Sequence, residues 1–234
     1  MKKLWMACLI VMLAVAPAPV LAQSGQSAQL GKVLDQMNAA SVKFRSAAAS
    51  FNADMYTAVV QQHEEQGGTI AVRKVRSSAE MKLHVTSEGG QATSRELLYK
   101  DGALDYYEPN LKQETIFKAG KNRQTYESLL TIGFGGSGRE LMADWQVTFE
   151  GMETMDGVKV AKLNLVSKSP TVRDNFSHIL MWIDPARSIA YKQEFFMSSG
   201  DTRTVTYSDI RYNAPLADSV FRIQVAPGTR RIVK

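Results

Sequence analysis

The sequence has little cysteine and little histidine: 234 residues contain one Cys, Cys8, and three His. Cys8 lies in an apolar N-terminal stretch that we expect to be removed, so the mature chain is predicted to lack disulfides. A domain of roughly 210 residues is large enough to be held together by its apolar core instead. His63, His84 and His178 do not stand at metal-ligand spacing from one another, which argues against a metal site.

Motifs of catalysis and of nucleic-acid binding are also missing. No nucleophile elbow, zinc-protease helix or Ser-x-x-Lys pattern stands in a context that would support it. The acidic pair Glu64-Glu65 is next to a turn, where carboxylates are normally solvated. The net charge is +5 at pH 7, without a long run of one sign. We therefore expect neither an enzyme nor a nucleic-acid-binding protein, and no cofactor.

The first 22 residues have the pattern of a secretory signal peptide. Lys2 and Lys3 precede an apolar block from Leu4 to Val15, and Val20 and Ala22 provide the small residues before a cleavage site. About 12 apolar residues are too few to cross a bilayer, which takes roughly 20. The sequence thus predicts a signal peptide at 1–22 and one exported mature domain at 23–234. The predicted absence of disulfides fits a bacterial envelope compartment better than a disulfide-dense extracellular module.

Periodicity predicts one helix followed by many strands. Apolar residues recur every three or four positions from Leu30 to near Ser46, with Ser27 as a plausible N-cap. From Ala47 onward the apolar period becomes two, and turn signals such as Asp101-Gly102 and Asp156-Gly157 recur every 8 to 12 residues. About eleven strands are expected, with a short one before Pro227-Gly228. This spacing is typical of an all-β sandwich or barrel in a single domain.

The segment 176–213 contains three β-like runs separated by two turns, one at Asp184-Pro185 and one at Ser199-Gly200. It is predicted to be an antiparallel meander that forms one wall of the domain. Alternation places either Ile179 and Met181 or, after a slip of one residue, Leu180 and Trp182 on the inner face.

The segment 120–145 differs from the rest of the mature chain. Tyr126 to Phe134 is predicted to contain a short helix, and four glycines follow within residues 133–138. A phosphate-binding loop is disfavoured because the Lys-Ser/Thr of a P-loop is absent. We interpret the segment as a flexible connection between two helical pieces, the second at residues 139–143.

Methionines and aromatic residues are spread over many of the predicted strands. An ordinary filled core is the usual role of such residues. Because methionine adapts its shape, they could equally line an open cavity for a ligand of variable chain length. The pattern alone leaves both alternatives open.

Three stretches resemble the outer-membrane lipoprotein carrier family, the LolA-like proteins. The first is the helix with Phe44 at its end, followed by Phe51 and the stretch 68–74. The second is the hairpin 99–109, with Asp-Gly, aromatic residues and Tyr-Glu-Pro, and the third is the Ile183-Asp184-Pro185 turn followed by 192–196. The resemblance extends over essentially the whole mature chain.

The resemblance implies a mainly β fold, a half-closed antiparallel β-barrel with an N-terminal amphipathic helix and a short mid-chain helical lid. It implies a non-enzymatic monomeric periplasmic carrier of acylated lipoproteins, with an inner-membrane lipoprotein-releasing transporter and an outer-membrane receptor as partners. A periplasmic binder or sensor of another lipid or glycolipid on the same fold is the alternative.

The implied fold and the strand alternation together predict the residues that bind acyl chains. They are Phe51, Met55, Met81, Leu83, Leu97, Leu104, Tyr106, Ile179, Met181, Ile183, Ile189, Tyr191 and Phe195. The lid is expected to pack Leu129, Leu130, Ile132 and Phe134 into the empty cavity and to be displaced by cargo. In the family a basic residue followed by proline holds the lid closed. The corresponding region here has no proline, which leaves Arg73, Lys74 and Arg76 as latch candidates.

Overall fold

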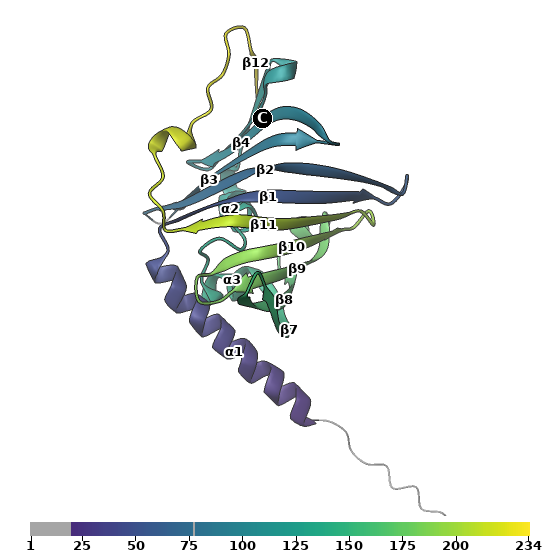
Figure 1. Cartoon of the computed structure of the whole chain (residues 1–234), viewed down its shortest axis with the longest axis vertical. Helices are drawn as coiled ribbons and strands as arrows, with labels where there is room; N and C mark the ends of the chain where they lie inside the picture. The colour runs from purple at the N-terminus through teal and green to yellow at the C-terminus, as the bar shows by residue number, and fades with distance from the viewer. Residues whose placement is uncertain (1–19, 77) are drawn as a thin grey trace, which may run out of the picture.

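One sheet of twelve strands dominates the computed structural model, which describes residues 20–76 and 78–234 (Figure 1). The strands are β1 (Ser46–Thr57), β2 (Gln62–Val75), β3 (Ser78–Glu88), β4 (Gln91–Lys100), β5 (Ala103–Glu108), β6 (Gln113–Lys118), β7 (Trp145–Met155), β8 (Val158–Ser167), β9 (Phe176–Asp184), β10 (Ile189–Met197), β11 (Thr202–Tyr212) and β12 (Arg230–Val233). The helices are α1 (Val20–Lys43), α2 (Arg123–Leu130), α3 (Gly138–Asp144) and α4 (Pro170–Arg173), with short 3₁₀ turns η1 (Pro109–Leu111), η2 (Gly120–Asn122) and η3 (Asp218–Phe221).

The strand order is β12-β6-β5-β4-β3-β2-β1-β11-β10-β9-β8-β7. Neighbouring strands are antiparallel except β12 and β6, which are parallel. Since β12 and β7 form separate edges, the sheet is not closed. The expected mainly β, half-open architecture with an N-terminal helix is confirmed. The last strand was predicted before Pro227-Gly228 but lies after it, where it pairs with β6.

The predicted hairpin turns have the backbone geometry that their residues favour. Asp101 and Gly102 both have positive φ, 52° and 77°, and Asp156 and Gly157 repeat this with 49° and 76°. Two successive positive φ values are typical of type I′ turns, whose twist matches that of the flanking strands. The meander of β9, β10 and β11 also forms as expected.

Helix α1 begins at Val20, earlier than the predicted start at Leu30, so Ser27 lies within the helix and is not its N-cap. Residues 1–19 of the predicted signal peptide lie outside the described residues. The helix ends where Asn213 accepts a 2.8 Å hydrogen bond from the amide of Arg45 and donates one to the carbonyl of Lys43. No helix in the described ranges is long and apolar enough to cross a membrane.

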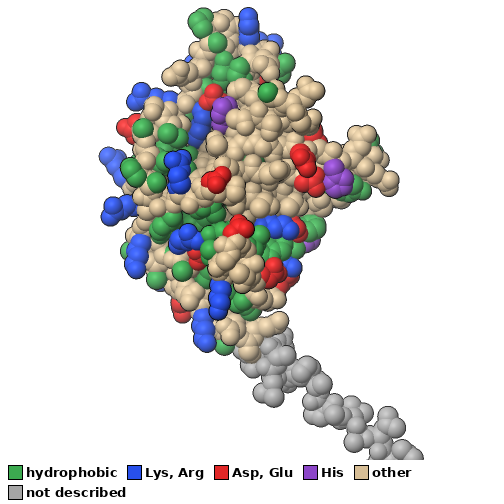
Figure 2. All heavy atoms as spheres, in the orientation of Figure 1, with side chains coloured by type: hydrophobic (Ala, Val, Ile, Leu, Met, Phe, Trp, Pro, Cys, Tyr) green, Lys and Arg blue, Asp and Glu red, His purple; other side chains and the backbone are tan. Residues whose placement is uncertain are grey.

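The two faces of the sheet are covered differently. We call the face that carries α2 and α3 the inner face. Its side chains form the main core together with Val33 and Met37 of α1 and Phe44, the residue after that helix. The outer face carries a smaller cluster around Phe221 of η3, as the C-terminal segment crosses it. Figure 2 shows the molecule from this side, with charges of both signs scattered around a wide area of uncharged atoms.

Candidate functional site: the cavity beneath the lid segment

Residues 123–144, which we call the lid segment, cross the inner face behind the strands in Figure 1. The segment consists of α2, a glycine-rich loop and α3. Helix α3 is capped by Ser137, the residue before it. The Ser137 hydroxyl accepts a hydrogen bond from the amide of Glu140, and the Glu140 carboxylate accepts one from the Ser137 amide. This capping box satisfies amides that a helix start would otherwise leave unpaired.

The lid segment directs apolar side chains toward the sheet. Ile132 and Phe134 are buried in the main core, and Leu129 and Leu130 are partly buried against it. The Phe134 ring meets the Tyr207 ring edge-on, with 5.1 Å between centroids. These side chains occupy part of the inner face, so a second apolar body could take their place only if the lid segment moved.

A cavity of about 580 Å³ lies between the lid segment, the end of α1 and the sheet. Volumes of this order are usual for small-molecule sites. Its apolar lining includes Met37, Phe44, Ile132, Phe134, Met181 and Ile183. Its charged lining includes Lys74, Lys121, Arg123, Glu127, Glu140 and Asp144. An apolar interior with charges at its margin suits an amphiphilic ligand.

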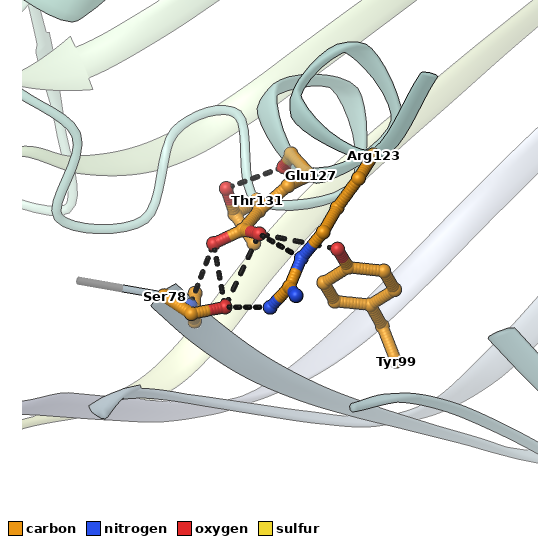
Figure 3. Close-up of polar contacts among 6 residues, drawn as sticks. Ser78, Tyr99, Arg123, Glu127 and Thr131 are labelled. Carbon is orange, nitrogen blue, oxygen red and sulfur yellow. Dashed lines mark hydrogen bonds and ion pairs between the residues drawn. The ribbon is translucent and has the colours of Figure 1, made fainter. Parts of the chain in front are cut away.

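Glu127 fastens α2 to the start of β3 (Figure 3). Its carboxylate accepts hydrogen bonds from the Ala79 amide at 2.7 Å, the Ser78 hydroxyl at 3.0 Å and the Tyr99 hydroxyl at 3.1 Å. Arg123, one helical turn earlier, lies 3.8 Å from the same carboxylate. Burial and the proximity of Glu127 raise the pKa of Tyr99, so its hydroxyl remains a donor. One acidic side chain thus holds one end of the lid segment.

The loop of the lid segment is fastened to the start of β10. Ala190 donates a backbone hydrogen bond to Gly133 at 2.7 Å, and Gly135 donates one to Ser188 at 2.8 Å. The Ser188 hydroxyl donates to the Gly136 carbonyl at 2.5 Å. Gln193, which is 1% exposed, donates from Nε2 to the Ile132 carbonyl at 3.0 Å and accepts from the Tyr207 hydroxyl at 2.7 Å. The loop is therefore held by polar contacts that can break without opening the sheet.

Two glycines let the lid segment approach α1 closely. Gly135 has φ of 75°, and a Cβ there would lie 2.1 Å from the Phe44 ring. At Gly138 a Cβ would lie 2.5 Å from the Leu34 carbonyl oxygen. The glycines that the sequence suggested as a source of mobility thus also have a packing role.

No family model and no curated protein matches this sequence. Among solved structures, an uncharacterised conserved protein from Thermus thermophilus aligns over 89% of this chain and 100% of its own, at 11% identity and a TM-score of 0.55. MucB aligns over 88% of this chain and 66% of its own, at 12% identity and a TM-score of 0.53. A LolA superfamily protein from Nitrosomonas europaea also matches, over 83% and 97% of the two chains, at 13% identity and a TM-score of 0.42.

The fold is LolA-like. The resemblance expected from the sequence is confirmed at this level, and at such low identities the likeness concerns the fold alone.

Most of the residues predicted to bind acyl chains lie on the inner face. The main core includes Phe51, Met81, Ile179, Met181, Ile183 and Ile189, and the residues partly buried against it include Leu83, Leu97, Leu104 and Phe195. Met55 and Tyr106 are half-buried, and Tyr106 donates from its hydroxyl to Glu108. Of the thirteen residues, Met181 and Ile183 line the cavity as it stands.

Tyr191 was expected on the inner face but lies on the outer one, where it packs with Val160 and Trp182. The cause is a β-bulge between Ala190 and Lys192, which interrupts the alternation of β10. The bulge leaves Tyr191 and Lys192 on the same face and turns Gln193 inward. Gln193 shares the alternation of the predicted residues Ile189 and Phe195, but it was not predicted because only apolar side chains were expected there.

The three residues predicted as latch candidates lie in three different surroundings. Arg73 lies on the outer face, opposite the lid segment, where it pairs with Glu80 and Asp218 and stacks over Phe221 at 4.2 Å. Lys74, its neighbour on the strand, lines the cavity, and Arg76 is exposed in the turn after β2. The contact between Glu127 and β3 was not predicted, because no sequence feature distinguishes a glutamate on a short helix that makes such a contact from one that does not.

Within the described ranges, no group of His, Cys, Asp and Glu side chains could hold a metal ion.

Proposed function

We propose that this protein is a periplasmic carrier that binds the acyl chains of lipoproteins beneath the lid segment and transfers them from the inner to the outer membrane. The observation that carries the proposal is the apolar inner face, occupied in part by the lid residues and in part by a cavity. The LolA-like fold supports it. An inner-membrane transporter and an outer-membrane receptor would be its partners.

A carrier must release what it binds, and the lid segment offers a way to do so. Burying acyl chains gains about 0.8 kcal/mol per methylene, so three long chains correspond to a gross gain of roughly 30 kcal/mol. That exceeds the ceiling of about 21 kcal/mol for non-covalent affinity. Displacing Leu130, Ile132 and Phe134 from the inner face offsets part of the gain, because their own burial is lost.

The most direct test is mass spectrometry of what co-purifies with the mature protein from the periplasm of its own cells. A lipoprotein supports the proposal. A free lipid or glycolipid supports instead the alternative carrier or sensor on the same fold. An empty protein that also takes up no added lipid contradicts both and leaves a structural domain.

A variant tests the lid directly. Leu130→Ser combined with Phe134→Ser removes apolar surface that the lid segment lays on the inner face. We expect lower stability of the empty protein together with altered cargo uptake. Tyr126→Ser is the matched control, because Tyr126 lies on the same helix and is 46% exposed. Unchanged uptake and stability in the double variant would contradict the displaced-lid proposal.

A further inference from the structure

Arg203 is the second residue of β11, at the end of that strand far from the junction of α1 and β1. It pairs across the sheet with Met55 of β1 and with Phe195 of β10. Val205 and Tyr207, two and four residues later on β11, belong to the main core. Since residues two apart share a face, the Arg203 side chain belongs to the same apolar wall.

The guanidinium of Arg203 has no anionic partner among the described residues. Its Nε is buried without a hydrogen-bond acceptor. Burial lowers the pKa of Arg203, and the nearby Tyr207 hydroxyl only partly opposes this. The Nε of Arg95 is also buried without an acceptor, but Arg95 differs in forming an ion pair with Glu88. The fold therefore neutralises one arginine and leaves the other uncompensated.

The Arg203 side chain as a whole is half-buried, with its Nε fully enclosed. A charge that is partly removed from water without a partner destabilises a protein, and an apolar side chain of similar size would stabilise it. Side chains that break a packing rule in this way often serve a ligand. A guanidinium offers a planar pair of donors that matches a carboxylate or a phosphate.

We propose that Arg203 binds the anionic head group, a carboxylate or a phosphate, of an acyl lipid held on the inner face. The inference rests on the acyl-binding part of the proposed function and defines the head group of the ligand. A thioether-linked lipoprotein anchor has no such acidic group. The ligand class is therefore a fatty acid or a phospholipid, carried in addition to or in place of lipoproteins.

The experiment measures binding of three lipids with the same oleoyl chain to the full mature protein, by displacement of the neutral dye N-phenyl-1-naphthylamine. Oleate carries a carboxylate, oleoyl lysophosphatidylglycerol a phosphate, and monoolein no charge. Wild type should bind at least one anionic lipid more tightly than monoolein. In Arg203→Met this preference should fall by roughly tenfold to a hundredfold, with monoolein affinity unchanged. Which anionic lipid loses affinity identifies the head group.

Stability separates a ligand role from a structural one. Arg203→Met should unfold at a higher temperature than wild type when no lipid is present, whereas a structural arginine would give a lower one. Arg203→Lys should retain part of the anionic preference. Arg211→Met is the matched control, because Arg211 is an exposed arginine on the same strand.

The outcomes distinguish this inference from the proposed function. If wild type binds none of the three lipids, both are wrong. If it binds all three equally, or if Arg203→Met keeps the anionic preference, the inference about Arg203 is wrong and the acyl-binding function stands.

Discussion

The side-chain nitrogen Nε2 of Gln193 lies 3.0 Å from the carbonyl oxygen of Ile132. The first group belongs to the rigid meander and the second to the loop of the lid segment. Both are enclosed, and the Tyr207 hydroxyl completes the group by donating to Gln193 Oε1. This buried amide joins the loop to the sheet, so the proposed opening of the lid segment would have to break its hydrogen bond.

Replacing Gln193 with leucine should loosen the lid segment. The substitution keeps the size of the side chain but leaves the Ile132 carbonyl and the Tyr207 hydroxyl without their partners. Unsatisfied buried groups cost about 1 to 3 kcal/mol each, so the free energy of unfolding should fall by an amount of this order. Hydrogen exchange of the amides in residues 131–136 should become faster. Gln146→Leu on the exposed side of β7 is the control, and equal exchange in the two variants would contradict the role of Gln193.

Glu127 should control how quickly the lid segment opens. Glu127→Ala removes the acceptor of the Ala79, Ser78 and Tyr99 hydrogen bonds at once. Hydrogen bonds to a charged group contribute about 1.5 to 3 kcal/mol, so uptake of an apolar dye should accelerate by roughly tenfold or more. Stopped-flow fluorescence measures this rate.

Two further variants bracket the Glu127 result. Tyr99→Phe removes a single donor and should have a smaller effect on the uptake rate. Glu65→Ala, at an exposed position of β2, should have none. An uptake rate in Glu127→Ala equal to that of wild type would show that the carboxylate does not restrain opening.

The lid segment is bonded to the sheet by the acidic Glu127, whereas a basic latch residue was predicted. Some features of this protein could be predicted from sequence patterns and others could not. Period-two alternation and Asp-Gly turns depend on local chain geometry, so they predicted the strands and an all-β sandwich or barrel. The LolA-like fold was predicted from the family resemblance alone. Which face receives Tyr191 or Gln193 depends on one bulge in β10, and nothing local in the sequence marks it. Partners such as Ser78 and Glu127 are brought together only by the folded sheet, so their contact could not be predicted from spacing.

Adjacent glycines of the lid segment should respond in opposite ways to alanine. At Gly135 a Cβ would meet the Phe44 ring at 2.1 Å, and the positive φ of 75° adds strain. Gly136 has open space around its Cβ position and no such φ. Gly135→Ala should therefore destabilise the protein by more than about 1 kcal/mol, by analogy with other overpacked or strained sites. Gly136→Ala should stay within about 0.5 kcal/mol of wild type. Urea unfolding measures the free energy of unfolding of both variants. Similar decreases in the two would show that the contact between Gly135 and Phe44 is not tight in solution.

Stability should depend on pH through Asp105 on β5. Burial, followed by the neighbouring Glu114 carboxylate, raises the pKa of Asp105 to about 6 from its ordinary value of 3.8. A raised folded-state pKa means that the protonated form is favoured by folding. The contribution of Asp105 is thus fully present below pH 3.8 and is lost as the pH rises through 6.

Asp105→Asn imitates the protonated side chain at every pH, so it should remove this dependence. We expect the variant to unfold at a higher temperature than wild type at about pH 7.5 and the difference to shrink as the pH falls toward about 4. Thermal unfolding at several pH values measures it. Asp35→Asn, on the exposed side of α1, controls for the change in net charge. A gain that stays constant with pH would mean that Asp105 titrates as it does in the unfolded chain. In that case the positive charge of Arg231, which pairs with Glu114 and lowers the pKa of Asp105, would offset the repulsion between the Asp105 and Glu114 carboxylates more fully than an exposed side chain is expected to do.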